Sequence, residues 1–86
     1  MYKVVVHKRG VRKLQFSPKS YLKRFSELVD LLKSNPVPWK EFDIKKVAGA
    51  EDTYRVRIGG FRVIYYVDKI DKTVHILKFD SRSRVY

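Results

Sequence analysis

The feature that most restricts the fold of this chain is a pair of strand-like runs separated by two glycines. In each run, residues suited to a core alternate with residues suited to a surface. Residues 53–58 (TYRVRI) and residues 61–67 (FRVIYYV) alternate as strands with one buried face do. Gly59 and Gly60 stand between them, and both can adopt the positive φ that a two-residue hairpin turn uses. The sequence therefore predicts an antiparallel hairpin whose register is set by its turn.

The turn also assigns each side chain of the predicted hairpin to a face. With the two glycines in the turn, Arg57 lies directly opposite Arg62. Because side chains alternate along a strand, one set points toward the core: Tyr54, Val56, Ile58, Phe61, Val63 and Tyr65. The opposite face then carries Arg55, Arg57, Arg62, Ile64 and Tyr66.

The other segments predict three more strands and two helices. Strands are expected at residues 2–7, 44–47 and 73–79. A short helix is expected at residues 8–16, and a longer one begins at Pro18 with Ser17 as its N-cap. In the longer helix, apolar residues recur at spacings of three and four as far as Leu32, and the segment Ser34-Asn35-Pro36 ends it.

Helices in one block and strands in another predict an α+β fold. The expected architecture is a small, mostly antiparallel β-sheet with two N-terminal helices packed on one face, in the order β-α-α-β-β-β-β. A chain of 86 residues is expected to form a single domain, residues 1–86. The second face of the sheet is then free to bind a partner.

The charge of the chain indicates what that partner is. Twenty Lys and Arg residues stand against nine Asp and Glu residues, which gives a formal net charge of +11 at pH 7. So large an excess of positive charge destabilises the folded protein through self-repulsion. The commonest reason for such a charge is a negatively charged partner. Nucleic acid, and RNA in particular, is the preferred interpretation. An anionic membrane surface and an acidic protein are the alternatives.

Several classes of function are excluded by what the sequence lacks. It has no cysteine, so disulfides, thiol catalysis and cysteine zinc sites are excluded. His7 and His75 stand alone in separate predicted strands and are interpreted as structural. With no metal-ligand spacing and no glycine-rich phosphate loop, no metal or cofactor is expected. The sequence shows no signal peptide and no membrane-length apolar run, so we expect a cytoplasmic protein without a membrane partner.

The arginines of the predicted hairpin are the strongest candidates for binding RNA. Like charges directly opposite each other on a sheet destabilise it, and nothing in the fold requires arginine at both 57 and 62. Together with Arg55, these two guanidinium groups can clamp phosphate, because each offers a planar fork of donors. The alternative is a solvated face of a protein that is basic everywhere. Lys45 and Lys46 flank the same region. The alternative interpretation for these two residues is that they are ordinary surface lysines.

A short basic tail follows the last predicted strand. Arg82 and Tyr86 can fold back over the sheet edge, and Arg84 lies between them in the sequence. A tyrosine can stack on an unpaired base or transfer a proton. The alternative interpretation of the whole tail is a frayed terminus without a function. Asp80 is expected to be the only acid near the arginines. An enzyme of this kind would therefore work with arginine, lysine and tyrosine.

Three segments together resemble the RelE branch of the RelE/ParE toxin superfamily: residues 46–49 (KVAG), 54–65 (YRVRIGGFRVIY) and 81–86 (SRSRVY). The resemblance implies the toxin of a type II toxin–antitoxin pair, a ribosome-dependent, metal-independent endoribonuclease that cleaves messenger RNA and inhibits translation. It also implies an acidic RelB-like antitoxin, the ribosome and messenger RNA as partners. Two rivals stay open: a ParE-type toxin that acts on a topoisomerase and cuts nothing, and a non-catalytic RNA- or DNA-binding module.

The resemblance assigns roles to individual residues. Arg55 and Arg57 match two basic positions on the family's third strand, and Arg62 matches the arginine that stabilises the transition state. The residue before Arg82 is a serine where many relatives have histidine, and relatives often continue into a further helix. The expected catalytic residues are Arg57, Arg62, Arg82 and Tyr86. The expected RNA- and phosphate-binding residues are Arg55, Lys45, Lys46 and Arg84. Lys45 and Lys46 are also the candidates for the general base.

Overall fold

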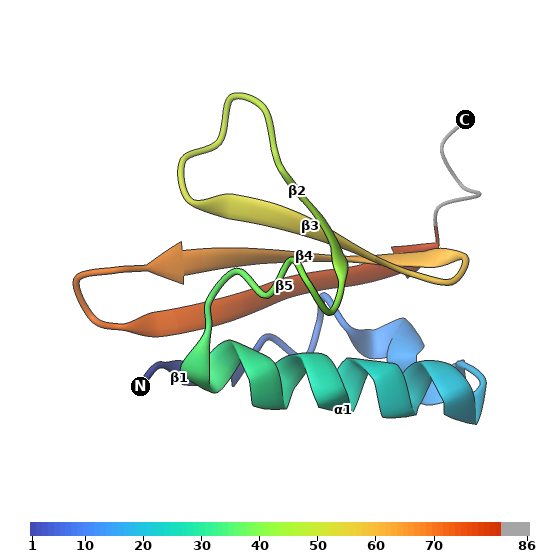
Figure 1. Cartoon of the computed structure of the whole chain (residues 1–86). Helices are drawn as coiled ribbons and strands as arrows, with labels where there is room; N and C mark the ends of the chain where they lie inside the picture. The colour runs from blue at the N-terminus through green and yellow to red at the C-terminus, as the bar shows by residue number, and fades with distance from the viewer. Residues whose placement is uncertain (82–86) are drawn as a thin grey trace.

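The structure is built on a five-stranded sheet with the strand order β1-β5-β4-β3-β2 (Figure 1). It is a computed structural model that describes residues 1–81. The strands are β1 (Lys3–Val6), β2 (Asp43–Lys46), β3 (Thr53–Ile58), β4 (Phe61–Asp68) and β5 (Thr73–Ser81). β1 pairs parallel with β5, and the other neighbouring strands pair antiparallel. The prediction of a mostly antiparallel sheet is confirmed.

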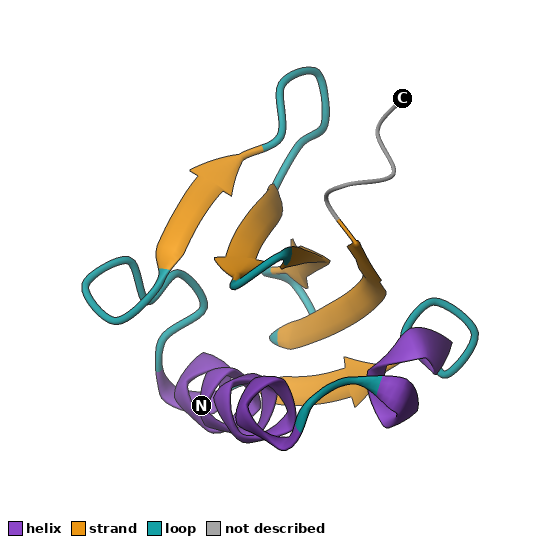
Figure 2. Ribbon diagram, turned by 90° about the vertical axis from the view of Figure 1, so that its right-hand side faces the viewer, coloured by secondary structure: helices purple, strands orange, loops and turns teal. Residues whose placement is uncertain are grey.

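Within residues 1–81, one α-helix and one short 3-10 helix lie on the same side of the sheet. α1 (Lys19–Ser34) runs beneath the curled strands, and η1 (Arg12–Phe16) precedes it (Figure 2). The α+β architecture is confirmed, but the first predicted helix is shorter than expected and is wound as a 3-10 helix. No helix within residues 1–81 is long and apolar enough to cross a membrane.

The predicted start of α1 is wrong by one residue. Pro18 is the N-cap, with φ −56° and ψ 150°, and the helix itself begins at Lys19. Ser17 does not cap the helix, because its hydroxyl donates a hydrogen bond backward to the carbonyl oxygen of Lys13 at 3.1 Å. Ser17 therefore closes the end of η1 instead of opening α1.

The apolar core lies between α1 and the sheet. Phe25, Leu28 and Leu32 of α1 are buried, and the Phe25 ring meets the Phe79 ring of β5 edge to face at 6.0 Å between centroids. The sheet contributes the buried residues Ile44, Val56, Ile58, Val63, Tyr65, Val67, Val74, Ile76 and Phe79. Each large apolar side chain that is fully buried stabilises the fold by roughly 1.5–3 kcal/mol.

Tyr65 links the connector after α1 to the middle of the sheet. Its side chain is fully buried and stacks on Tyr54, with 5.5 Å between ring centroids. Its hydroxyl donates a hydrogen bond to the carbonyl oxygen of Pro36 at 2.7 Å. Burial raises the pKa of Tyr65, because desolvation disfavours the tyrosinate form.

The β3–β4 hairpin has the predicted register, with Arg57 opposite Arg62 and Ile58 opposite Phe61. Of the two turn glycines, only Gly59 has positive φ, at 57°, which fits a type II′ turn better than a type I′ turn. A Cβ atom on Gly59 would lie 2.5 Å from the ring of Tyr21 in α1. The Tyr21 ring also meets Phe61 edge to face at 5.3 Å, so α1 supports the hairpin turn.

β5 contains an irregularity that decides which of its side chains reach the open face. Ile64 pairs with Lys78, but the next residue of β4, Tyr65, pairs with Ile76, so Leu77 has no partner on β4. Gly10 lies against this bulge: its carbonyl oxygen accepts a hydrogen bond from the Phe79 amide at 2.8 Å. A bulge changes the direction in which later side chains point. Phe79 is consequently buried in the core, and Lys78 is exposed.

Candidate nucleic-acid interface

A row of four charged residues crosses the open face of the sheet at right angles to the strands. The cross-strand partners, from β2 to β5, are Asp43, Arg57, Arg62 and Asp80. We call these four residues the arginine row. The two cations are in the middle and the two carboxylates are at the ends, so each arginine has an acid as its other cross-strand neighbour.

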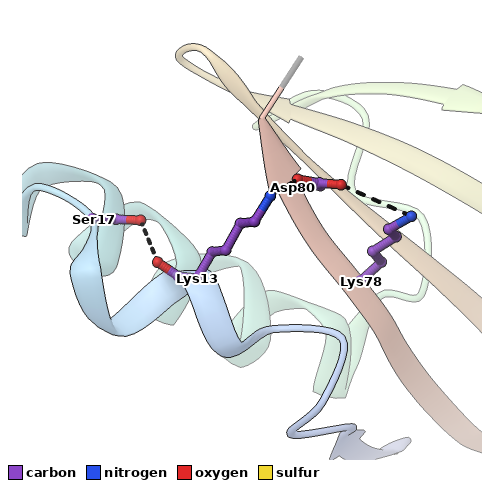
Figure 3. Close-up of polar contacts among 4 residues, drawn as sticks. All are labelled: Lys13, Ser17, Lys78 and Asp80. Carbon is purple, nitrogen blue, oxygen red and sulfur yellow. Dashed lines mark hydrogen bonds and ion pairs between the residues drawn. The ribbon is translucent and has the colours of Figure 1, made fainter. Parts of the chain in front are cut away.

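Both carboxylates of the arginine row form ion pairs. The Asp43 Oδ2 atom lies 3.7 Å from the Arg57 Nε atom, and both side chains are about half exposed. Asp80 binds two lysines, with its Oδ1 atom 2.7 Å from Lys13 Nζ and its Oδ2 atom 3.9 Å from Lys78 Nζ (Figure 3). The prediction that Asp80 is the only acid near the arginines is therefore wrong, because the β2–β3 register places Asp43 beside Arg57.

A second row lies next to the arginine row and contains no acid. Its cross-strand partners, from β2 to β5, are Lys45, Arg55, Ile64 and Lys78. We call these residues the lysine row. Between the two rows is a hollow of only about 10 Å³, lined by Asp43, Lys45, Arg55 and Arg57. This hollow is too small to enclose a ligand, and the two rows suit a chain that lies across them.

The two lysines predicted to act together lie on opposite faces of β2. Lys45 pairs with Arg55 on the open face. Lys46 shares its face with Ile44, which is buried, and pairs with Tyr54, whose ring stacks on Tyr65. Because Lys46 is on an edge strand, its own side chain stays exposed. Lys45 therefore lies on the same face as the arginines, and Lys46 does not.

Reasoning from the sequence missed the basic residues that surround β5. A hollow of about 170 Å³ beside the bulge is lined by Arg9, Gly10, Arg12, Lys13, Lys78, Phe79 and Asp80. Lys78 belongs to both this hollow and the lysine row. Regular alternation from Val74 and Ile76 would bury Lys78, so a lysine in that position was the available signal for a bulge.

The open face also carries an aromatic group that the sequence did not reveal. Tyr66 of β4 pairs with His75 of β5, and their rings stack at 6.2 Å between centroids. The His7 Nε2 atom lies 3.1 Å from the His75 Nδ1 atom, so the two rings share a hydrogen bond. The description of these histidines as isolated is wrong, because the parallel pairing of β1 with β5 brings them together.

The remaining predicted residues, Arg82, Arg84 and Tyr86, lie outside the described residues. Of the predicted set, Arg55, Arg57, Arg62 and Lys45 are brought together on one face. Guanidinium and ammonium groups at neighbouring positions of a rigid sheet are suited to binding successive phosphates.

Comparison with known proteins identifies similar sequences. The family model described as "ParE toxin of type II toxin-antitoxin system, parDE" matches residues 8–86. A protein of Methanocaldococcus jannaschii named "Putative toxin RelE1" is 45% identical over 85 residues, covering 99% of this chain and 94% of that protein.

Solved structures show the same fold. The archaeal RelE–RelB complex from Pyrococcus horikoshii OT3 contains a chain that is 44% identical, with a TM-score of 0.85 and 98% of each chain covered. The RelB–RelE antitoxin–toxin complex from Methanococcus jannaschii matches with a TM-score of 0.80 at 23% identity, over 95% of this chain and 94% of the other. The isolated E. coli RelE toxin matches with a TM-score of 0.79 at 15% identity, over 98% of this chain and 87% of that one.

Proposed function

Because this chain belongs to the RelE/ParE family of type II toxins, we propose that it is a ribosome-dependent endoribonuclease that cleaves messenger RNA and thereby stops translation. The arginine row is the observation that carries this proposal. It places two guanidinium groups side by side on a face that neither helix of residues 1–81 covers. Two like charges placed opposite each other repel, and binding the phosphates of RNA gives that placement a purpose.

The chemistry of RNA cleavage matches this arrangement. The ribose 2′-oxygen attacks the adjacent phosphorus, and the 5′-oxygen of the next nucleotide leaves. Negative charge grows on the phosphate oxygens in the five-coordinate transition state. Arg62 and Arg57 stabilise that charge, and each well-placed donor contributes roughly 3–4 kcal/mol. The ribosome supplies the geometry of the messenger, so part of the rate comes from orientation.

The other residues of the open face have supporting roles in this proposal. Arg55 and Lys45 bind the phosphates next to the scissile one. Lys45 is the better candidate for the general base, because Lys46 is on the other face of β2. We assign to Lys46 only the electrostatic attraction of RNA to the edge of the sheet. We assign Arg82 to transition-state stabilisation, Tyr86 to stacking or proton transfer, and Arg84 to phosphate binding.

An acidic antitoxin of the RelB kind is the second partner in this proposal. The net charge of +11 favours an acidic ligand, and two of the similar solved structures are complexes with RelB. An apolar groove of about 500 Å³ between η1 and α1, lined by Lys8, Val11, Arg12, Leu14, Gln15 and Leu22, can take apolar side chains of that ligand beside its acidic groups. We treat residues 1–86 as one domain that acts in the cytoplasm, where translating ribosomes are.

A ParE-type activity is the alternative that a specific observation favours, because the matching family model is described as a ParE toxin. A toxin of that type acts on a topoisomerase and leaves messenger RNA intact. The 45% identical relative and the 44% identical solved chain both carry the RelE name, which supports the ribonuclease.

The test is to add the protein to a translating extract and map the ends of the messenger. Cuts within codons that require ribosomes support the ribonuclease. Intact messenger together with inhibited DNA supercoiling supports the ParE-type activity, and RNA binding without either effect supports a non-catalytic module.

Two variants sharpen this test. Arg62→Ala should lower the cleavage rate by about 100-fold or more, the scale of losing one charge-stabilising donor. Lys23→Ala removes the same charge from an exposed position on α1 and should leave cleavage unchanged. Equal loss in both variants would mean that total charge, and not the arginine row, sets the rate.

A further inference from the structure

Tyr66, His75 and His7 extend the open face beyond the two charged rows. Arg62, Ile64 and Tyr66 point to the same side of β4 because they alternate along one strand. Tyr66 lies four residue steps along the extended strand from Arg62, a distance of about 13 Å. The open face therefore changes from charged to apolar to aromatic along a single strand.

The three rings are accessible and are fixed in place. Tyr66 is 37% exposed although it is a large aromatic residue. Its ring and the His75 ring are nearly parallel, with an interplanar angle of 26°. On the far side of His75, a hydrogen bond holds the ring of His7, the residue that follows β1. The three rings thus contact one another and form one aromatic surface on the open face.

We infer that Tyr66, His75 and His7 form a stacking platform for an unpaired base of the RNA whose phosphates cross the arginine and lysine rows. The inference rests on the proposed function, because it takes the same single-stranded RNA as ligand. Every base has an aromatic face, so such a platform accepts any base and holds the strand without reading its sequence. Along β4, Ile64 lies between Arg62 and the platform. It carries no charge, so it does not compete with the arginines for the phosphate backbone of the RNA.

The platform and the charged rows should have separable effects on binding. A stacking contact depends on the base and releases no counterions, whereas a phosphate contact is weakened by salt. Removal of an aromatic ring should weaken RNA binding equally at all salt concentrations. Removal of an arginine should also reduce the steepness of the salt dependence.

The experiment compares two probes of equal length and charge: a short oligouridylate and a matching ribose-phosphate oligomer without bases. The wild-type protein should bind the oligouridylate about tenfold more tightly, on the scale of one stacked base. Tyr66→Leu keeps an apolar side chain of similar burial and should remove most of that difference. Tyr66→Phe keeps the ring and should preserve it. Circular dichroism should confirm that both variants are folded.

Three outcomes would overturn the platform. The wild-type protein could bind both probes equally, Tyr66→Leu could retain the preference for bases, or Tyr66→Leu could lose affinity together with a shallower salt slope. The proposed function fails differently, because then oligouridylate binding persists while the translating extract shows no cuts. A folded Tyr66→Leu variant with wild-type base preference sinks the platform and leaves the ribonuclease intact.

Discussion

Arg57 and Arg62 are direct partners across the β3–β4 hairpin, and each faces a carboxylate on its other side, Asp43 for Arg57 and Asp80 for Arg62. The repulsion between two like charges in such a pair is worth a few tenths to about 1 kcal/mol. The flanking acids offset part of it, since the exposed Arg57–Asp43 ion pair contributes about 0–1 kcal/mol and Asp80 places a negative charge opposite Arg62. The arginine row is therefore close to neutral in its effect on folding.

Replacement of either arginine should leave the stability nearly unchanged. For Arg57→Ala and Arg62→Ala, we expect the free energy of unfolding to change by less than about 0.5 kcal/mol. The repulsion that is relieved is offset in Arg57→Ala by loss of the Asp43 ion pair and in Arg62→Ala by loss of the cation next to Asp80. Urea denaturation measures this change. Leu28→Ala, at a fully buried position of α1, is the comparison and should cost about 2–5 kcal/mol. An arginine variant that loses as much as Leu28→Ala would show that the row is structural.

Neutralising the acid beside Arg57 should tighten RNA binding. Asp43 competes with phosphate for the guanidinium group at 3.7 Å, so Asp43→Asn frees it. We expect affinity for a short single-stranded RNA to rise by up to about fivefold at low salt, the scale of one exposed ion pair. The gain should shrink as salt is added. Asp71→Asn, which removes an exposed carboxylate from the β4–β5 turn, serves as the control; an equal gain there would point to net charge alone.

Gly10→Ala should be strongly destabilising. A Cβ atom at this position would lie 1.6 Å from the carbonyl oxygen of Leu77, which is backbone and cannot move aside without disturbing the bulge. We expect a loss of about 2 kcal/mol or more, as for severe overpacking. Gly60→Ala is the matched control, because a Cβ atom there meets nothing within 4 Å. Similar melting temperatures for the two variants would contradict the close packing of Gly10 against the bulge.

The hydroxyl of Tyr65 should make the fold sensitive to alkali. Burial raises the pKa of Tyr65 above the value of about 10 for tyrosine in an unfolded chain. The stability that this protonated group contributes is complete below pH 10 and is lost as the pH rises further. In a pH titration followed by the ultraviolet absorbance of tyrosinate, one part of the signal should appear only together with unfolding.

Tyr65→Phe should remove that late part of the signal and cost about 1 kcal/mol near neutral pH, since the carbonyl oxygen of Pro36 loses its donor. Tyr66→Phe, at an exposed position, should leave the late part in place. If the late signal survives Tyr65→Phe, another tyrosine is its source.

The sequence predicted those parts of the fold that depend on local patterns. The Gly59-Gly60 turn gave the register of β3 and β4 and so placed Arg57 opposite Arg62, and the spacing of apolar residues gave α1 to within one residue. It also gave the composition of the open face on those two strands. These features are determined by neighbours in the chain, which is why the residues alone reveal them.

Features that depend on pairing between strands far apart in the sequence could not be predicted from local patterns. The contact between His7 and His75 exists because β1 joins the sheet parallel to β5, a choice that neither strand's own sequence encodes. Lys78 reaches the open face through a bulge at Leu77, which is held by Gly10 from another part of the chain. The proximity of Asp43 to Arg57 likewise depends on how β2 pairs with β3.

The pairing of β1 with β5 has a consequence for how the molecule is made. Lys3 meets Thr73, so the sheet closes a loop that includes α1 and three other strands. Loop-closure entropy makes such distant pairings slow, whereas the β3–β4 hairpin and α1 can form early from local contacts. β5 supplies one end of both charged rows and the centre of the aromatic group. During synthesis, both charged rows therefore stay incomplete until β5 has emerged and paired with β4, and the aromatic group is completed only when the amino-terminal strand joins β5.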